Sequence, residues 1–143
     1  MDLKGPFFYQ SEYMGNKQLL VMIDDDTDDH EIFKMAINEL NEPLQCLFFL
    51  DCESAIAHFS INTSTPPGYV FIDLRLPRID GDECLEELQK LKQFDGPWLV
   101  AYSSSIPTEY RSKLSRIGVD QFIEKTGSIQ QLTSQIQNLL LTS

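Results

Sequence analysis

Positive charge is scarce in this 143-residue chain, which has 11 Lys and Arg residues against 22 Asp and Glu residues. The formal net charge of −11 argues against general electrostatic attraction to nucleic acid or to an anionic membrane. No apolar run approaches the roughly 18 residues of a membrane span, and residues 1–17 hold none that could serve as the core of a signal peptide. We therefore expect a cytoplasmic protein that binds neither nucleic acid nor membrane.

Cysteine and histidine are also few. The three cysteines, Cys46, Cys52 and Cys84, form no C-x-x-C pair, and their odd number predicts reduced thiols. The two histidines, His30 and His58, fall on different predicted helices with no cysteine at ligand spacing, which argues against a zinc site. The loops G-x-x-x-x-G-K-[ST] and G-x-G-x-x-G are absent too, so we do not expect nucleotide binding.

The composition is that of one folded domain, with 42% hydrophobic and 23% charged residues. Residues 1–17 contain two glycines, a proline and four aromatic residues without a helix or strand period. This pattern predicts an N-terminal extension, and the remaining residues 18–143 form the predicted domain.

Apolar runs typical of buried strands alternate with helical patterns along this domain. The predicted strands are 19–23, 44–50, 69–74, 98–103 and 121–124. The predicted helices are one that ends at Asn41, then 53–59, 81–94, 108–117 and 128–141. This (βα)₅ order predicts an α/β fold in which helices cover both faces of a doubly wound parallel sheet.

Polar residues follow four of the five predicted strands. They are Asp24 to Asp26 after the first strand, Asp73 after the third, Ser103 to Ser105 after the fourth and Lys125 after the fifth. Such sheets carry their functional groups at the carboxyl ends of the strands, so we expect these side chains to meet at one edge.

Six carboxylates lie between Asp24 and Glu31. Three of them, at positions 28, 29 and 31, fall in the first turn of a helix, where the helix dipole favours negative charge. Asp24 and Asp25 instead end a buried strand, where clustered carboxylates repel one another unless a cation lies among them. Oxygen ligands of this kind suit Mg²⁺.

Asp73 needs a different explanation from helix capping, because the next predicted helix begins about seven residues later, near Gly81. Ser103 alone could be an ordinary loop serine, and Lys125 alone could be a surface lysine. Their spacing is more informative than their identity: Ser103 lies 30 residues after Asp73, and Lys125 lies 52 residues after it.

The run Leu19 to Asp29, the segment Asp73 to Gly81, Ser103 and the segment Phe122 to Lys125 together resemble the receiver domain of two-component response regulators. The resemblance extends from about Gln18 to the end of the chain. It implies the flavodoxin-like receiver fold with strand order 2-1-3-4-5.

The resemblance implies that Asp73 is the phosphoacceptor for a phosphohistidine on a histidine kinase or phosphotransfer protein. It also implies a Mg²⁺ site formed by Asp24, Asp25, Asp73 and the backbone carbonyl of Arg75. Lys125 would pair with a phosphoryl oxygen. The domain would assist its own phosphorylation and dephosphorylation in this way, without being a classical enzyme.

The resemblance further implies a two-state switch. Ser103 would donate its hydroxyl to the attached phosphoryl group, and Phe122 would then turn toward the space left by the loop. Phenylalanine replaces a frequent tyrosine here, so packing would carry this part of the switch; Phe122 could equally be an ordinary apolar strand residue.

Thr126 stands where the family usually has a proline preceded by a cis peptide bond, which costs about 2.5 to 4 kcal/mol before any other residue. We nevertheless expect Lys125 to reach Asp73.

The leading hypothesis is a stand-alone response regulator whose output is contact with a downstream protein or phosphoryl relay; a homodimer is left open. One alternative is a receiver-like adaptor that binds its partner whatever its phosphorylation state. Another is a Mg²⁺-dependent phosphohydrolase, but Arg75 stands where that family usually has a second aspartate.

Overall fold

Five parallel strands form one sheet in the computed structural model, which describes residues 19–143. The predicted N-terminal extension, residues 1–17, lies outside the described residues. The strands are β1 (Leu19–Ile23), β2 (Gln45–Phe49), β3 (Tyr69–Ile72), β4 (Trp98–Ser103) and β5 (Gln121–Glu124). Their order in the sheet is β2-β1-β3-β4-β5, which confirms the predicted fold.

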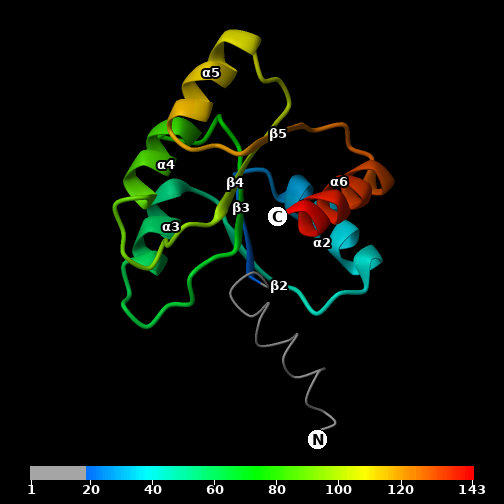
Figure 1. Cartoon of the computed structure of the whole chain (residues 1–143), viewed down its shortest axis with the longest axis horizontal. Coiled ribbons are helices and arrows are strands. Elements are labelled where there is room, and N and C mark those ends of the chain that lie inside the picture. The colour runs from blue at the N-terminus through cyan, green and yellow to red at the C-terminus, as the bar shows by residue number, and fades with distance from the viewer. Residues whose placement is uncertain (1–18) are drawn as a thin grey trace, which may run out of the picture.

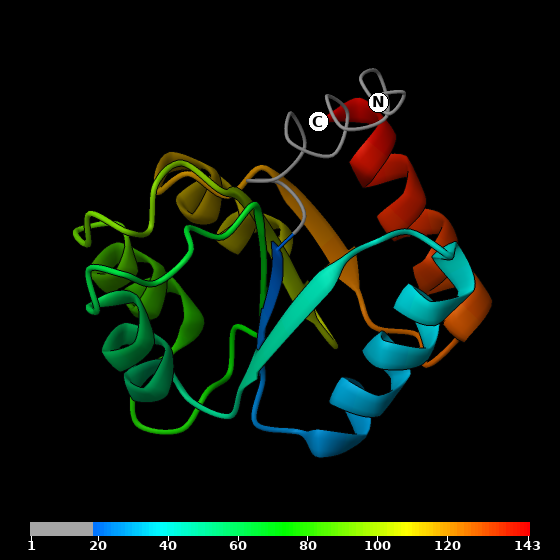
Figure 2. The ribbon, with the colours of Figure 1, turned by 90° about the horizontal axis from the view of Figure 1, so that it is seen from below.

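Five helices cover the two faces of this sheet. They are α2 (Thr27–Leu40), α3 (Cys52–Phe59), α4 (Gly81–Leu88), α5 (Thr108–Arg116) and α6 (Ile129–Thr142). Figures 1 and 2 show α2 and α6 side by side on one face and α3, α4 and α5 on the other. Within the described residues, no helix is both long enough and apolar enough to cross a membrane.

The apolar runs of β1 and β3 become the two fully buried strands. Since side chains alternate between the faces of a sheet, each run contributes to two separate cores. Leu19, Val21 and Ile23 of β1 pack with α3, α4 and α5, whereas Leu20 and Met22 pack with α2 and α6. A central parallel strand is covered by helices on both faces, so its sequence must be apolar at every position.

Short polar side chains define where the helices begin and end. The carboxylate of Asp26 accepts the backbone N–H of Asp28 at the start of α2, and Asp51 does the same for Ser54 at the start of α3. At the other end of α2, Asn41 adopts the left-handed conformation with φ 54°, which stops the helix.

The predicted helix 81–94 was too long, because α4 ends at Leu88. Beyond it the backbone N–H of Lys90 bonds to the carbonyl of Glu87, and that of Leu91 bonds to the carbonyl of Leu88. These bonds span three residues, so the chain continues as tight turns. Phe94 is still buried in the core, which explains why the apolar pattern extends past the helix.

The prediction of reduced thiols was wrong for two of the three cysteines. A disulfide joins Cys52, the first residue of α3, to Cys84 in the middle of α4. Both residues are fully buried, and their Cα atoms are 5.7 Å apart. Cys46 is free and half-buried, and burial raises the pKa of its thiol to about 11.

Reduction of the Cys52–Cys84 disulfide is expected to lower the free energy of unfolding by about 4 kcal/mol. The bond closes a loop across 32 residues of sequence separation, and opening it restores conformational entropy to the unfolded chain. Denaturant unfolding of oxidised and dithiothreitol-reduced protein measures the difference. The Cys46→Ala variant should show the same difference, and equal stability in the two redox states would contradict the prediction.

Candidate functional site

The four polar strand ends meet at one edge of the sheet because the strands pair in register. Ile23 at the end of β1 pairs with Ile72 at the end of β3, so Asp24 and Asp73 emerge next to each other. Ser103 pairs with Glu124 in the β4–β5 ladder, which brings Lys125 to the same edge.

Asp24 is the fully buried carboxylate of the site, and hydrogen bonds fix both its backbone and its side chain. Its own backbone N–H donates to the carbonyl of Phe49 at 3.0 Å, and its carboxylate accepts the backbone N–H of Asp26 at 2.9 Å. The buried ring of His30 donates from Nε2 to the backbone carbonyl of Asp24 at 2.7 Å. Burial raises the pKa of the Asp24 carboxyl to about 6, although its hydrogen bonds to Lys125 and Asp26 oppose the rise.

Asp73 lies at the centre of the site. Its Oδ1 accepts hydrogen bonds from Ser103 Oγ and from the backbone N–H of Arg75, each at 3.0 Å. Its Oδ2 accepts from the Lys125 ammonium at 2.8 Å. Every donor comes from a different segment, so the carboxylate is fixed in orientation before any ligand arrives.

The Lys125 ammonium bonds to three carboxylates at once. Nζ is 2.7 Å from Asp24 Oδ2, 2.7 Å from Asp29 Oδ2 and 2.8 Å from Asp73 Oδ2. An ammonium has three N–H donors, so this set uses them all. Burial disfavours the charged form, but the three carboxylates outweigh it and raise the pKa of Lys125.

Asp29 was misjudged at the sequence level as only a favourable charge at a helix start. It does lie in the first turn of α2, but its carboxylate also binds Lys125. No local signal identifies this role, because Asp25 precedes the helix, whose N-cap is Asp26, and Lys125 lies 96 residues further along the chain.

Asp25 completes a group of three carboxylates with Asp24 and Asp73. One oxygen from each lies within 4.8 Å of the other two, and Asp25 is exposed while Asp24 is buried. The donors are hard oxygens open to solvent on one side, which fits Mg²⁺ with bound water and phosphate completing its coordination. Negative charge also exceeds positive charge here, because one ammonium faces these three carboxylates and Asp29.

The loop between β3 and α4 packs tightly against Asp73. The backbone N–H of Gly81 donates to the carbonyl of Leu74 at 3.0 Å. A Cβ at Gly81 would lie 2.5 Å from the backbone oxygen of Asp73, so only glycine fits. Arg75, predicted to supply a backbone carbonyl, lies in this loop and orients Asp73 through its N–H.

Phe122 does not join the polar cluster. It is half-buried against the core on the α5 side, and the Arg111 guanidinium lies 5.2 Å from its ring centroid. Arg111 also donates to the carbonyl of Ile106, in the loop after β4, and pairs with Glu124 at 3.5 Å. Phe122 is therefore connected through Arg111 to the loop that follows Ser103.

The replacement of proline by Thr126 leaves Lys125 in reach of Asp73. Residues 19–143 contain no cis peptide bond, so the Lys125–Thr126 bond is trans. The backbone N–H of Lys125 bonds to the carbonyl of Ser103 at 2.9 Å, and its Nζ lies over the Tyr102 ring at 5.3 Å from the centroid. These contacts to β4 direct the lysine into the site.

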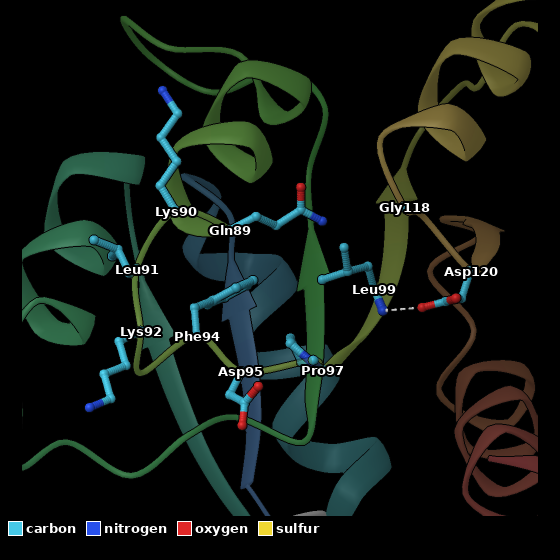
Figure 3. A pocket seen from close by; sticks show the side chains of 11 residues that line it. Gln89, Lys90, Leu91, Lys92, Phe94, Asp95, Pro97, Leu99, Gly118 and Asp120 are labelled. Atoms are coloured by element: carbon cyan, nitrogen blue, oxygen red, sulfur yellow. Dashed lines mark hydrogen bonds between the residues drawn. The ribbon is translucent and has the colours of Figure 1, made fainter.

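A hollow of about 600 Å³ lies away from this cluster, beside the amino end of β4 (Figure 3). On one side of it the Leu99 N–H donates to the Asp120 carboxylate at 2.9 Å. Figure 3 shows Lys90 and Lys92 pointing outward, and the Asp120 carboxylate already accepts the hydrogen bond from Leu99. A smaller hollow of about 240 Å³ adjoins the cluster, between Arg75, Ser105 and Tyr110.

Comparison with known proteins gives a consistent result. A sequence model described as the response regulator receiver domain matches residues 20–137. A curated relative, the hybrid signal transduction histidine kinase D of Dictyostelium discoideum, is 23% identical over 140 residues. The match covers 97% of this chain but only 9% of that protein.

Solved structures share the fold. The phosphorylated cyanobacterial phytochrome response regulator RcpA has a TM-score of 0.73 at 22% identity, with 86% of this chain and 91% of that chain covered. The receiver domain of a sensor histidine kinase from Pseudomonas aeruginosa has a TM-score of 0.67 at 15% identity, with 85% and 96% covered. The latter structure has a magnesium ion coordinated in its active-site cleft.

Replacement of Asp24 by asparagine is expected to stabilise the fold at pH 7 without divalent cations. The raised pKa means that the folded state binds the Asp24 proton more tightly than the unfolded chain does, so stability falls as pH rises from about 4 to about 6. Asp24→Asn removes this loss and should gain about 1 to 3 kcal/mol at pH 7.

Denaturant unfolding at pH 4 and pH 7 measures the effect. The gain should disappear near pH 4, and the exposed Asp95→Asn variant should show no such pH-dependent gain. A variant that is less stable than wild type at pH 7 would show that the Asp24 carboxylate stabilises the fold.

Proposed function

Because the chain belongs to the response regulator receiver domain family, we propose that its predicted domain, residues 18–143, accepts a phosphoryl group on Asp73 and passes the signal to another protein. The observation that carries the proposal is the placement of Asp73 between a lysine ammonium at 2.8 Å and a serine hydroxyl at 3.0 Å, beside two further carboxylates. A positive charge and a hydroxyl donor beside a fixed carboxylate are what phosphoryl transfer requires.

Mg²⁺ is the proposed cofactor. Asp24, Asp25 and Asp73 would hold it together with the backbone carbonyl of Arg75, and the ion would supply charge that lowers the repulsion between carboxylate and phosphoryl group. The magnesium in the Pseudomonas aeruginosa relative supports the same choice. The structure of this protein also supports Mg²⁺ binding, because the carboxylates in the site outnumber its single ammonium group.

The proposed phosphodonor is a phosphohistidine on a histidine kinase or phosphotransfer protein. An oxygen of Asp73 attacks phosphorus, an O–P bond forms and the P–N bond breaks, leaving its electron pair on the imidazole nitrogen. Asp73 ends as an acyl phosphate. The Arg75 N–H and the Ser103 hydroxyl hold the attacking group in one orientation, so much of the entropy cost is met by the fold.

Lys125 and Ser103 would change partners during this step. Lys125 gives up a carboxylate contact in favour of a phosphoryl oxygen, with Asp24 and Asp29 keeping its ammonium in place. Ser103 turns its hydroxyl from the Asp73 carboxylate to the phosphoryl group and draws the loop after β4 inward. The domain assists its own phosphorylation and dephosphorylation by these contacts.

Phe122 is the proposed readout of this movement. Arg111 contacts both the Phe122 ring and the carbonyl of Ile106, so displacement of the loop after β4 changes the surroundings of the ring. The output is contact with a downstream protein on the face formed by α5, β5 and α6. This proposal applies to the domain alone or within a longer protein.

Incubation with Mg²⁺ and acetyl phosphate should add one phosphoryl group to the wild-type protein. Asp73→Asn should add none, because an amide is not a nucleophile of this kind, and omission of Mg²⁺ should also prevent the addition. Intact mass spectrometry measures the product. Asp95→Asn, which removes an exposed carboxylate at the opposite edge of the sheet, should be phosphorylated as wild type.

Absence of a mass gain in wild type under every condition would overturn the proposal. It would favour the adaptor that binds a partner regardless of phosphorylation. A gain that persists in Asp73→Asn would place the acceptor elsewhere.

Mg²⁺ should stabilise the wild-type fold, because the three carboxylates converge only in the folded state. At a free Mg²⁺ concentration ten times its Kd, the ion should contribute about 1.4 kcal/mol, which raises Tm by about 5 °C. Asp25→Ala should lose this rise, and Asp95→Ala should keep it. Thermal unfolding with and without Mg²⁺ measures the shift; an equal rise in Asp25→Ala would remove Asp25 from the metal site.

A further inference from the structure

The Cys52–Cys84 disulfide involves α4, the helix that follows the loop containing the proposed phosphoacceptor Asp73. It connects α3 to α4, which lie side by side in Figures 1 and 2. Helix α4 follows directly from the β3–α4 loop, residues 73–80, which contains Asp73 and Arg75. Both cysteines belong to the same buried cluster as Leu74 and Leu76 of that loop.

The first residue of α4, Gly81, packs closely against the backbone of Asp73. As described above, Gly81 is hydrogen-bonded to Leu74 and approaches the Asp73 backbone too closely for any side chain. Tightly packed groups transmit displacement instead of absorbing it. A shift of α4 relative to the sheet therefore moves the backbone on both sides of the phosphoacceptor.

The start of α3 also holds the middle of the loop. Arg78, which has φ 68°, pairs with Asp51 at 3.1 Å and with Glu53 at 2.8 Å, the two residues that flank Cys52. These ion pairs are exposed, so they contribute little on their own. The covalent bond from α3 to α4 is the stronger constraint, and it acts on the loop through α4.

We propose that Cys52 and Cys84 are a reversible thiol pair whose oxidation state sets the reactivity of Asp73. This inference rests on the proposed function. Formation of the bond by thiol–disulfide exchange transfers two electrons and two protons from the thiols to a small-molecule disulfide, which is reduced to two thiols; a dithiol reductant returns them and is itself oxidised to a disulfide. In the cytoplasm, the location that we expect for this protein, most disulfides that occur are transient, catalytic or redox-sensing.

Reduction replaces a covalent bond by two thiols, which need more separation than bonded sulfurs. Because both sulfurs lie in the packed core, α3 and α4 must move apart or repack, and the β3–α4 loop follows α4. The loop carries the Arg75 backbone, which orients Asp73 and is proposed to contact Mg²⁺. The reduced protein should therefore bind Mg²⁺ less tightly and accept phosphate more slowly, by about fivefold or more.

Exchange with a reductant requires opening of the contact between α3 and α4, because neither sulfur is exposed. The two helices have only eight residues each, so such local opening does not require unfolding of the sheet. The reductant class that fits is a dithiol, because it completes the exchange without leaving a mixed disulfide in the core.

The test compares the full chain in its oxidised and dithiothreitol-reduced states. Alkylation under denaturing conditions should label one cysteine in the oxidised state and three in the reduced state. The rate of phosphorylation by acetyl phosphate and a Mg²⁺ titration are then measured in both states. Cys46→Ala should keep the difference, whereas the double variant Cys52→Ala, Cys84→Ala should respond to neither oxidant nor reductant.

Equal rates and equal Mg²⁺ affinities in the two states would overturn the inference and leave the pair a structural bond. Three labelled cysteines after treatment with oxidised glutathione would overturn it too. If no state accepts phosphate, the proposed function fails, and hydrogen exchange of residues 74–80 decides the inference separately: equal exchange in both redox states contradicts it. If the double variant does not fold, the comparison of oxidised with reduced wild-type protein still tests the inference.

Discussion

The contact of the Lys125 ammonium with Asp24, Asp29 and Asp73 is the interaction on which the site depends. Four strand ends and the first turn of α2 deliver acidic groups or donors to one edge, and a single cation holds them together. Without it, buried Asp24 would face like charges at short range, which low dielectric makes costly. Even with this contact, carboxylates outnumber ammonium groups at the site, so negative charge remains in excess there.

The fold could be predicted from the sequence because each strand and helix has its own local signal. Continuous apolar runs identify β1 and β3, and alternation with helical patterns leaves parallel pairing as the consistent arrangement. Asp24, Asp73, Ser103 and Lys125 were predicted to share an edge from the strand-end rule and their spacing, and the structure brings them together. Their chemical roles remain proposals.

Three features could not be predicted from local pattern. Cys52 and Cys84 meet only because α3 packs against α4, and no spacing rule describes that distance. The partner of Asp29 lies 96 residues further along the chain, so its helix position gave an incomplete account. Helix α4 ends early because tight turns bury Phe94 without continuing the helix. In each case tertiary packing decided between options that the local sequence allows.

The division of the molecule into two cores on opposite sides of the sheet has an evolutionary consequence. The core under α2 and α6 shares no side chain with the core under α3, α4 and α5, so substitutions in one add nearly independently to substitutions in the other. Substitutions in α6, and in α2 beyond the first turn that supplies Asp29 and His30 to the site, can therefore accumulate while the helices around the β3–α4 loop keep their packing. The two halves of the molecule can in this way change at different rates around one shared sheet.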